Sequence, residues 1–449
     1  MSLVPRTLRL ALAASLFATA CPAPGQTLPE LLRILVDKHP DLVRAQLAID
    51  AAREQVKQAY SPFLPRIGVQ YDQARATNRL LGINTAQETR QTAAFVQWNL
   101  FNGGGDVARL NATESGKAAA ESDLEDLREE LALSLTEAYM NVVTADRQVL
   151  NAQMLVKDLA ALAETVRARV DSGASADNEL FQATSKLLQA KNSLALAQGR
   201  YAGSRNRLSA LVGERVTWVV DPILSSELAV RRLDELVSLA TAVNPQVRSA
   251  ESRVRAASAD MRSARAEFLP KLQFEARKNL TLEGPNQLQS GLERESLFTV
   301  TYIIPLGGST YFRWTELAAR RAAAEATIET VKLKIRAELG ETREILLEQR
   351  AIARQIEERV AASVRVFDAY RLQYDAGKRS LIDLILVRED QYAGQEALIT
   401  NLSEQRVGAA RLHRGLGQLR AVLLDPEAAN KSLAGLTLDT ANEAPHSIR

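Results

Sequence analysis

The sequence contains one pattern twice, with an offset of 205 or 204 residues between the copies. The matching positions are leucine-rich starts, proline breaks and glycines: Leu28/Leu233, His39-Pro40/Asn244-Pro245, Phe63-Leu64-Pro65/Phe268-Leu269-Pro270, Gly103-Gly104/Gly307-Gly308, Gly173/Gly377 and Gly213/Gly417. A nearly constant offset over half of a chain indicates an internal duplication. We therefore predict a first repeat over 27–213, a linker over 214–231 and a second repeat over 232–417.

Each repeat changes its hydrophobic period in the same order. A helical segment comes first, and two stretches follow in which apolar and polar residues alternate, as in a strand with one apolar face. The predicted strands cover about 66–76 and 92–101 in the first repeat, and about 271–280 and 296–305 in the second. Glycines follow each strand pair and predict the turns from strand to helix: Gly103, Gly104, Gly307 and Gly308.

Very long helices are predicted after these glycines. From Leu124 onward the apolar positions recur about every 3.5 residues, which is the period of a coiled coil. The helices over 106–170 and 310–375 would each be about 100 Å long. Gly173 and Gly377 then allow a turn into a returning helix. The predicted fold class is mainly α with a small β part, a long antiparallel coiled-coil helical barrel that carries four strands per chain.

Both ends of the chain differ from the repeats. Basic residues precede the short apolar run 10–20, which predicts a secretory signal peptide over 1–25 with cleavage after Gly25. A weak lipobox ends at Cys21, so that lipidation of this cysteine is the alternative way in which the signal is processed. The segment 418–449 is polar and interrupted by prolines, and we expect a loosely ordered tail there.

The four strands do not form a closed sheet within one chain. The smallest membrane barrels have about eight strands, and an open edge is excluded from lipid because its backbone groups would stay unpaired. Three chains would supply twelve strands and close the sheet. Aromatic residues near the strands fit a girdle at a membrane interface: Phe63, Tyr71, Trp98, Phe101, Phe268, Phe274, Phe298 and Tyr302. The alternative is a soluble periplasmic coiled-coil scaffold with a small sheet.

The composition argues against several other classes of protein. With 56 basic and 54 acidic residues the net charge is +2, and a nucleic-acid-binding face is not expected. The three histidines, His39, His413 and His446, have no spacing that suits a metal site or a catalytic triad. The glycines 103–105 lack the Lys-Ser/Thr of a phosphate-binding loop. We therefore expect no metal, no cofactor and no enzymatic activity.

Taken together and in order, these motifs resemble the TolC-like outer-membrane factor family, also called outer membrane efflux proteins. The resemblance covers about 27–417 and is strongest in the segments 98–104 (WNLFNGG) and 374–384 (YDAGKRSLIDL). It implies a homotrimer with a twelve-stranded barrel in the outer membrane and a helical tunnel in the periplasm. It also implies a periplasmic adaptor and an inner-membrane transporter, either ABC-type or proton-driven, as partners. Small-molecule efflux and type I protein secretion both fit this role.

The resemblance also assigns residues to a gate at the periplasmic tip. The family's tip tyrosine and arginine correspond to Tyr374 and Arg379, and their aspartate and threonine partners correspond to Glu179 and Asn178. The constricting aspartate ring corresponds to Asp383, where three copies would favour cations. A second aspartate of some members is replaced here by Leu386. The alternative is that these polar residues only cap a helical turn.

Overall fold

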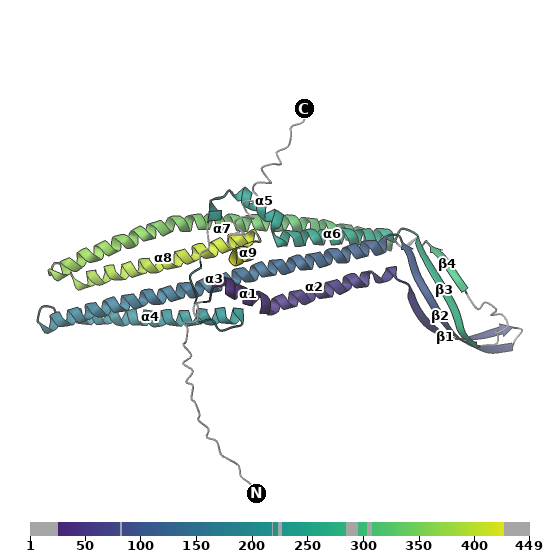
Figure 1. Ribbon diagram of the computed structural model, residues 1–449, viewed down its shortest axis with the longest axis horizontal. Coiled ribbons are helices and arrows are strands. Elements are labelled where there is room, and N and C mark those ends of the chain that lie inside the picture. Colours follow the sequence, from purple (N-terminus) through teal and green to yellow (C-terminus); the bar gives the residue numbers. More distant parts are fainter. Residues whose placement is uncertain are drawn as a thin grey trace, which may run out of the picture.

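The computed structural model describes residues 26–80, 83–217, 219–222, 227–283, 295–302 and 308–425. They form an elongated molecule in which long helices run side by side and a four-stranded sheet continues them at one end (Figure 1). The predicted class, mainly α with a small β part, is confirmed. Several predicted features lie outside the described residues: the signal peptide, Cys21, part of the linker, the end of the predicted strand over 296–305, Gly307 and the tail after 425.

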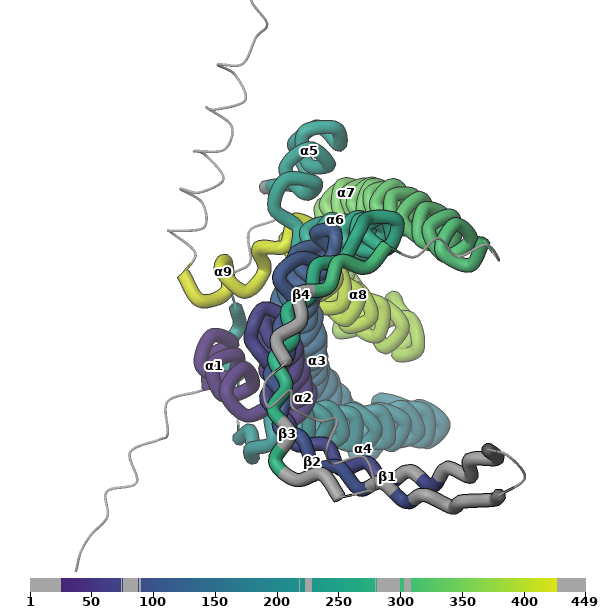
Figure 2. The backbone as a smooth tube through the Cα atoms, turned by 90° about the vertical axis from the view of Figure 1, so that its right-hand side faces the viewer, coloured from purple at the N-terminus to yellow at the C-terminus, as the bar shows by residue number. Residues whose placement is uncertain are grey.

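Two helical hairpins make up most of the length. Helix α3 (Gly105–Asp171) turns into α4 (Asp177–Val212), and α7 (Ser309–Asp375) turns into α8 (Leu381–Gly415). The helices α3 and α7 have 67 residues each, so that each is about 100 Å long. Seen along the long axis, the helices form a curved layer that is open on one side (Figure 2).

No helix in the described part of the chain has the length and apolar character that a membrane-spanning helix requires.

A shorter helix pair precedes the sheet in each repeat. The pairs are α1 (Leu28–Lys38) with α2 (Pro40–Ala59), and α5 (Leu233–Val243) with α6 (Pro245–Ala266). Proline lacks an amide hydrogen and therefore ends the first helix while fitting the first turn of the second. The residue before each proline caps the new helix, because the side chains of His39 and Asn244 accept hydrogen bonds from the amides of Asp41 and Gln246.

The strands form one antiparallel sheet in the order β1-β2-β3-β4. They are β1 (Arg66–Leu80), β2 (Ile83–Asn102), β3 (Lys271–Glu283) and β4 (Glu295–Thr301). The first three strands are longer than the alternation of side chains predicts. The reason is that β1 and β2 remain paired through the polar segment between them, up to Leu80 opposite Ile83, and backbone pairing does not require apolar side chains.

The sheet has one apolar and one polar face. Exposed apolar side chains alternate along β1 (Ile67, Val69 and Tyr71), and Val300 of β4, opposite Leu272, lies on the same face. On the other face Arg277 of β3 reaches across β2 and contacts Asp72 and Gln70 of β1. Because Lys271 and Arg277 are an even number of residues apart on β3, Lys271 also lies on the polar face.

Gly103 allows the close turn from β2 into α3. Its φ angle is +61°, and a β-carbon at this position would lie 2.4 Å from the carbonyl oxygen of Ala266. Any other residue would therefore push α6 away from the start of α3.

The two repeats are joined through the linker and the middle of α3. The buried hydroxyl of Tyr139 donates to the carbonyl oxygen of Val220 (2.6 Å) and lies 3.0 Å from that of Gln26. Asp221 binds both Arg147 of α3 and Arg406 of α8. The residue before α1 and the linker therefore both contact the middle of α3.

One part of the predicted polar tail is in fact packed in the core. Residues Leu419–Leu424 form helix α9, in which the side chains of Leu419 and Leu423 are buried. Two apolar residues four positions apart lie on one side of a helix, which is too short a pattern to recognise in a polar segment. The carboxylate of Glu129 on α3 accepts hydrogen bonds from the amides of Leu419 (2.7 Å) and Arg420 (3.3 Å) at the start of α9.

Burial raises the pKa of the Glu129 carboxyl to about 7, although the amides at the start of α9 and the nearby Arg420 and Arg414 oppose the shift. The ordinary value is 4.5. The folded protein therefore keeps a proton that the unfolded chain releases between these pH values. Stability from this group is present at low pH and is lost as the pH rises from about 4.5 to about 7.

We expect Glu129→Gln to remove this pH dependence, because the amide keeps an acceptor for the α9 amides and does not ionise. Thermal melts followed by helical circular dichroism should match those of the wild type at acidic pH. At alkaline pH the variant should unfold a few degrees higher. Glu130→Gln, at the exposed neighbouring position, is the control and should leave the pH profile unchanged. A wild-type profile in Glu129→Gln would contradict the assignment.

Candidate functional site

The turns of the two hairpins lie next to each other at the end of the molecule remote from the sheet, which we call the tip (Figure 1). Gly173 (φ +76°) and Gly377 (φ +70°) are left-handed, as the predicted turns require. The hydroxyl of Ser380 accepts a hydrogen bond from the amide of Asp383 and caps α8. The tip therefore consists of two glycine turns of the same design, one from each repeat.

Arg169 and Tyr374 form the closest link between the two hairpins at the tip. The Arg169 guanidinium lies 4.6 Å from the centre of the Tyr374 ring and donates to the Asp375 carboxylate at 2.9 Å. It also lies 3.4 Å from the carbonyl oxygen of Tyr374. The ring is buried, so that its contact with the cation is shielded from water. One arginine of the first repeat thus holds the end of α7 by three contacts.

Glu179 lies close to the Tyr374 hydroxyl. Burial, and next the Glu179 carboxylate, raise the pKa of Tyr374. Within this chain Glu179 accepts a hydrogen bond from the Ser175 hydroxyl at 2.5 Å rather than from the tyrosine. The structure therefore brings the predicted partners Tyr374 and Glu179 together, with Arg169 and Ser175 around them.

The other predicted gate residues are not joined across the two hairpins within one chain. Arg379 stays on its own hairpin, where its guanidinium lies 3.7 Å from the Tyr370 ring centre and 3.7 Å from the Asp383 carboxylate. Asn178 is exposed on the opposite hairpin, and Leu386 is 51% exposed. The predicted contact between Arg379 and Asn178 is therefore not made inside the chain.

A second set of links connects the hairpins further from the tip, and no sequence pattern indicated these links. The Asp158 carboxylate of α3 binds Arg388 of α8 and accepts a hydrogen bond from the Tyr392 hydroxyl at 2.6 Å. Lys186 of α4 pairs with Glu389 of α8 at 2.9 Å. Burial, and next Asp158, raise the pKa of Tyr392 to about 12.

Sequence reasoning missed Arg169 and Asp158 because neither belongs to a recognised motif. For Arg169 a signal was available, since it occupies the last turn before Gly173, just as Gln373 and Tyr374 occupy the last turn before Gly377. For Asp158 no signal was present, because acidic residues are frequent along both long helices and only packing selects one of them.

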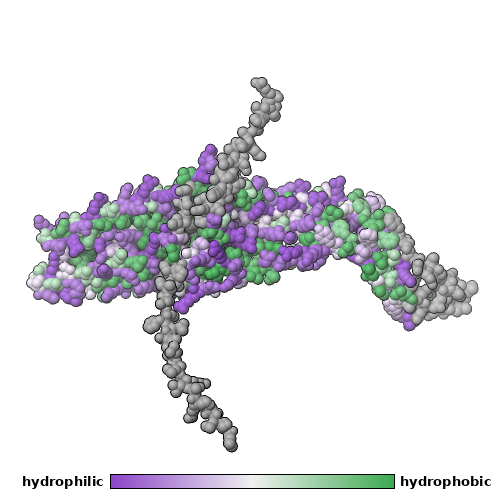
Figure 3. All heavy atoms as spheres, viewed as in Figure 1, coloured by the Kyte–Doolittle hydropathy of each residue, from purple (hydrophilic) through white to green (hydrophobic). Residues whose placement is uncertain are grey.

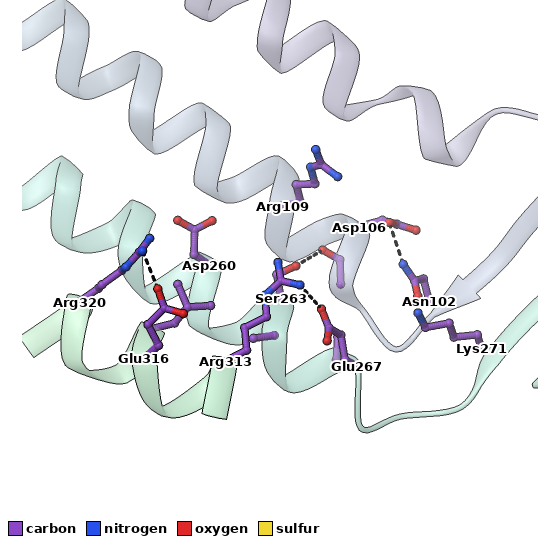
Figure 4. Close-up of a pocket in the computed structure, with 14 residues that line it drawn as sticks. Asn102, Asp106, Arg109, Asp260, Ser263, Glu267, Lys271, Arg313, Glu316 and Arg320 are labelled. Atoms are coloured by element: carbon purple, nitrogen blue, oxygen red, sulfur yellow. Dashed lines mark hydrogen bonds and ion pairs between the residues drawn. The ribbon is translucent and has the colours of Figure 1, made fainter. Parts of the chain in front are cut away.

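A charged cavity of 570 Å³ lies at the opposite end, where the helices meet the sheet (Figure 4). It is lined from α3, α6, α7 and β3 by as many cationic as acidic side chains: Arg109, Lys271, Arg313, Arg320, Asp106, Asp260, Glu267 and Glu316. Two of the arginines are already paired, Arg313 with Glu267 and Arg320 with Glu316. Burial raises the pKa of Asp260, against the effect of the surrounding arginines.

The tip and the charged cavity are both built mainly from charged and polar side chains in contact. In the described part of the chain no group of three or more metal-ligating side chains comes together. At the tip, ion pairs, a contact between an arginine and a ring, and hydrogen bonds join the two hairpins around a buried apolar cluster that includes Val166 and Leu384.

The fold is shared with solved outer-membrane channels. The structure of the outer membrane protein VceC from Vibrio cholerae matches with a TM-score of 0.75 and 19% identity, covering 87% of this chain and 96% of that one. The model of the outer membrane efflux protein family matches residues 31–214 and again 236–418. The chain belongs to the outer membrane efflux protein family.

Two relatives show the range of transport within the similar proteins. The pyoverdine export outer membrane protein OpmQ of Pseudomonas putida is 24% identical over 87% of this chain and 85% of its own length. The alkaline protease secretion protein AprF of Pseudomonas aeruginosa is 24% identical over 44% of this chain and 42% of its own length. Family membership identifies this chain as an outer-membrane channel for export and not an enzyme, and it argues against the soluble scaffold.

Proposed function

We propose that three copies of this chain form a continuous duct, with twelve strands in the outer membrane and the helices as a tunnel through the periplasm. The observation that carries the proposal is the sheet, which has an exposed apolar face and two edges, β1 and β4, that no other described strand of the chain covers. Joining β4 of one copy to β1 of the next would pair those backbone groups. The curved layer of helices in Figure 2 fits one third of such a tunnel.

The duct would act as the passive exit of a tripartite efflux or type I secretion system. Its energy would come from an inner-membrane transporter, of the ABC or proton-driven type, reached through a periplasmic adaptor protein. The names of the relatives support both uses, since one exports the small molecule pyoverdine and another secretes a protease. The tip is the part of the chain furthest from the membrane and therefore the natural place for the adaptor and transporter.

We propose that the tip is the gate, and that Arg169, Tyr374 and Glu179 hold it closed from within each chain. Arg379 and Asn178, which do not meet inside the chain, are then left for contacts between neighbouring copies. Three copies of Asp383 would line the constriction, where the Arg379 guanidinium beside each carboxylate moderates the negative potential. Leu386 lies about one turn further along α8 and would add an apolar ring.

A charge on the apolar face of the sheet tests the membrane placement and the trimer together. Val69→Arg should reduce the amount of trimer on unheated gels of the outer-membrane fraction, because arginine facing mid-membrane lipid costs about 2–4 kcal/mol. Gln273→Arg, on the polar face of β3, is the control and should leave the trimer intact. A monomer in detergent-free buffer, or equal effects of both changes, would contradict the proposal.

The gate predicts a change in single-channel conductance. Arg169→Ala removes the contacts with Tyr374 and Asp375 and should raise the conductance several-fold in planar bilayers. Arg167→Ala is the control, because Arg167 pairs only with Glu164 of its own helix in the described structure. Joint replacement of Tyr374 and Arg379 should also open the tip. Unchanged conductance in Arg169→Ala trimers of normal heat stability would remove the gating role.

The short segment between Cys21 and Gln26 argues against a lipid on Cys21 that is embedded in the membrane. Gln26, the first described residue, contacts Tyr139, and Tyr139 lies about 50 Å along α3 from Gly105 at the sheet. The five residues from Cys21 to Gln26 extend over at most about 18 Å. An acyl chain on Cys21 would therefore not reach a membrane that holds the sheet.

We accordingly propose that the signal peptide is removed after Gly25. Intact-protein mass spectrometry of the mature chain should show an unmodified N-terminus at Gln26. Cys21→Ala should be processed and delivered to the outer membrane like the wild type. A mature chain that begins with a diacylglyceryl-modified Cys21 would overturn this assignment.

A further inference from the structure

A second hollow, of 980 Å³, lies at the junction of the helices and the sheet, and we call it the junction groove. It runs between the starts of α3 and α7 and the end of α6. Most of its lining is apolar or aromatic, and it also contains two arginines. Its lining residues include Val107, Arg262, Arg265, Phe268, Tyr311 and Trp314. In Figure 3 apolar residues gather over this junction and the adjoining part of the strands.

The junction groove lies on the side of the apolar face of the sheet. Asp260 of α6 and Glu267, the residue that follows this helix, line the charged cavity of Figure 4, whereas Arg262 and Arg265 of α6 line the groove. At about 100° per residue these two sets lie on roughly opposite sides of α6. The charged cavity includes Lys271, which lies on the polar face of the sheet. The groove is therefore on the side that faces lipid.

The charges of the groove favour an anion. Its lining includes Arg262 and Arg265 but no carboxylate, in contrast to the balanced charges of the cavity behind it. Both arginines are exposed, and no ion pair is formed by either within the described residues. They lie three positions apart, which places their side chains next to each other on one face of the helix.

The apolar part of the groove favours acyl chains. The side chains of Val107, Phe268 and Tyr311 are all at least 40% exposed, which leaves a continuous apolar surface uncovered in the chain. The rings of Tyr311 and Trp314 lie 6.3 Å apart at the start of α7. Aromatic side chains with a polar edge are stable at the boundary between lipid tails and headgroups. The groove thus has an apolar part and a cationic part side by side.

We propose that the junction groove binds one phospholipid of the periplasmic leaflet. The phosphate is held by Arg262 and Arg265, and the acyl chains lie along Val107, Phe268 and the aromatic residues of α7. The bound lipid fixes the depth of the protein in the membrane at the point where strands become helices. This inference requires the sheet to be in the outer membrane, but it does not depend on the trimer or on the gate at the tip.

The test is a titration of the detergent-solubilised protein with palmitoyl-oleoyl phosphatidylglycerol, followed by native mass spectrometry. Arg262→Glu/Arg265→Glu should weaken lipid retention by about tenfold or more, because two charges that attract the phosphate are reversed. Arg262→Lys/Arg265→Lys should retain most of the binding. Arg248→Glu/Arg255→Glu, at exposed positions of α6 outside the groove, makes the same change in net charge and should have no effect.

A second measurement locates the lipid. In a Trp98→Phe/Trp218→Phe background the remaining Trp314 should be quenched by phosphatidylglycerol brominated on its acyl chains, and the double glutamate variant should lose this quenching. Equal lipid retention in the two charge-reversed variants, or no quenching of Trp314, would overturn the proposal. The proposal would also be overturned if the double glutamate variant lost a co-purifying protein but retained its lipid, because the groove would then bind a protein. Heat-resistant trimer and conductance, measured in parallel, test the duct separately.

Discussion

Backbone amide and carbonyl groups cannot stay unpaired in hydrocarbon, and the small sheet of this chain has two edges with no partner among the described strands. The sheet also has an exposed apolar face and lies at the end of the long helices, so that this constraint affects how the whole chain is arranged. In the proposed trimer, pairing with further copies would satisfy it, and the curved layer of helices continues from the same strands. The tunnel would then be a consequence of how the sheet is closed.

The duplication gives each chain two similar hairpins, and the structure joins them with side chains rather than with backbone. Asp158 and Arg169 of the first repeat hold Arg388, Tyr392, Tyr374 and Asp375 of the second. Such ion pairs and hydrogen bonds are strong where they are shielded from water, and each side chain can also pair with another partner. Around these links the two hairpins also share a buried apolar cluster, which includes Val166, Tyr374 and Leu384.

The two ends of the molecule have different chemistry because they meet different surroundings. The tip is rich in ion pairs and hydrogen bonds that compete with water, whereas the junction groove combines apolar surface with two arginines that form no ion pair among the described residues. The two sides of α6 differ as well, because the charged cavity on one side is lined by both acidic and cationic residues and the groove on the other side contains no carboxylate. A membrane boundary on one side and an aqueous lumen on the other would produce such a contrast.

The amino-acid sequence alone determined the duplicated order of helix, strands and hairpin, the glycine turns and the alternation that shows an apolar face, because each depends on residues close together in the chain. It also placed Tyr374 and Glu179 at one tip through the resemblance to the family. Only the tertiary structure decided that Arg169 and Asp158 are among the residues that join the two hairpins, that Leu419 and Leu423 are buried, and that Arg262 and Arg265 line one groove. These contacts are made between helices far apart in the sequence, where packing geometry selects one charged or apolar residue from many similar ones.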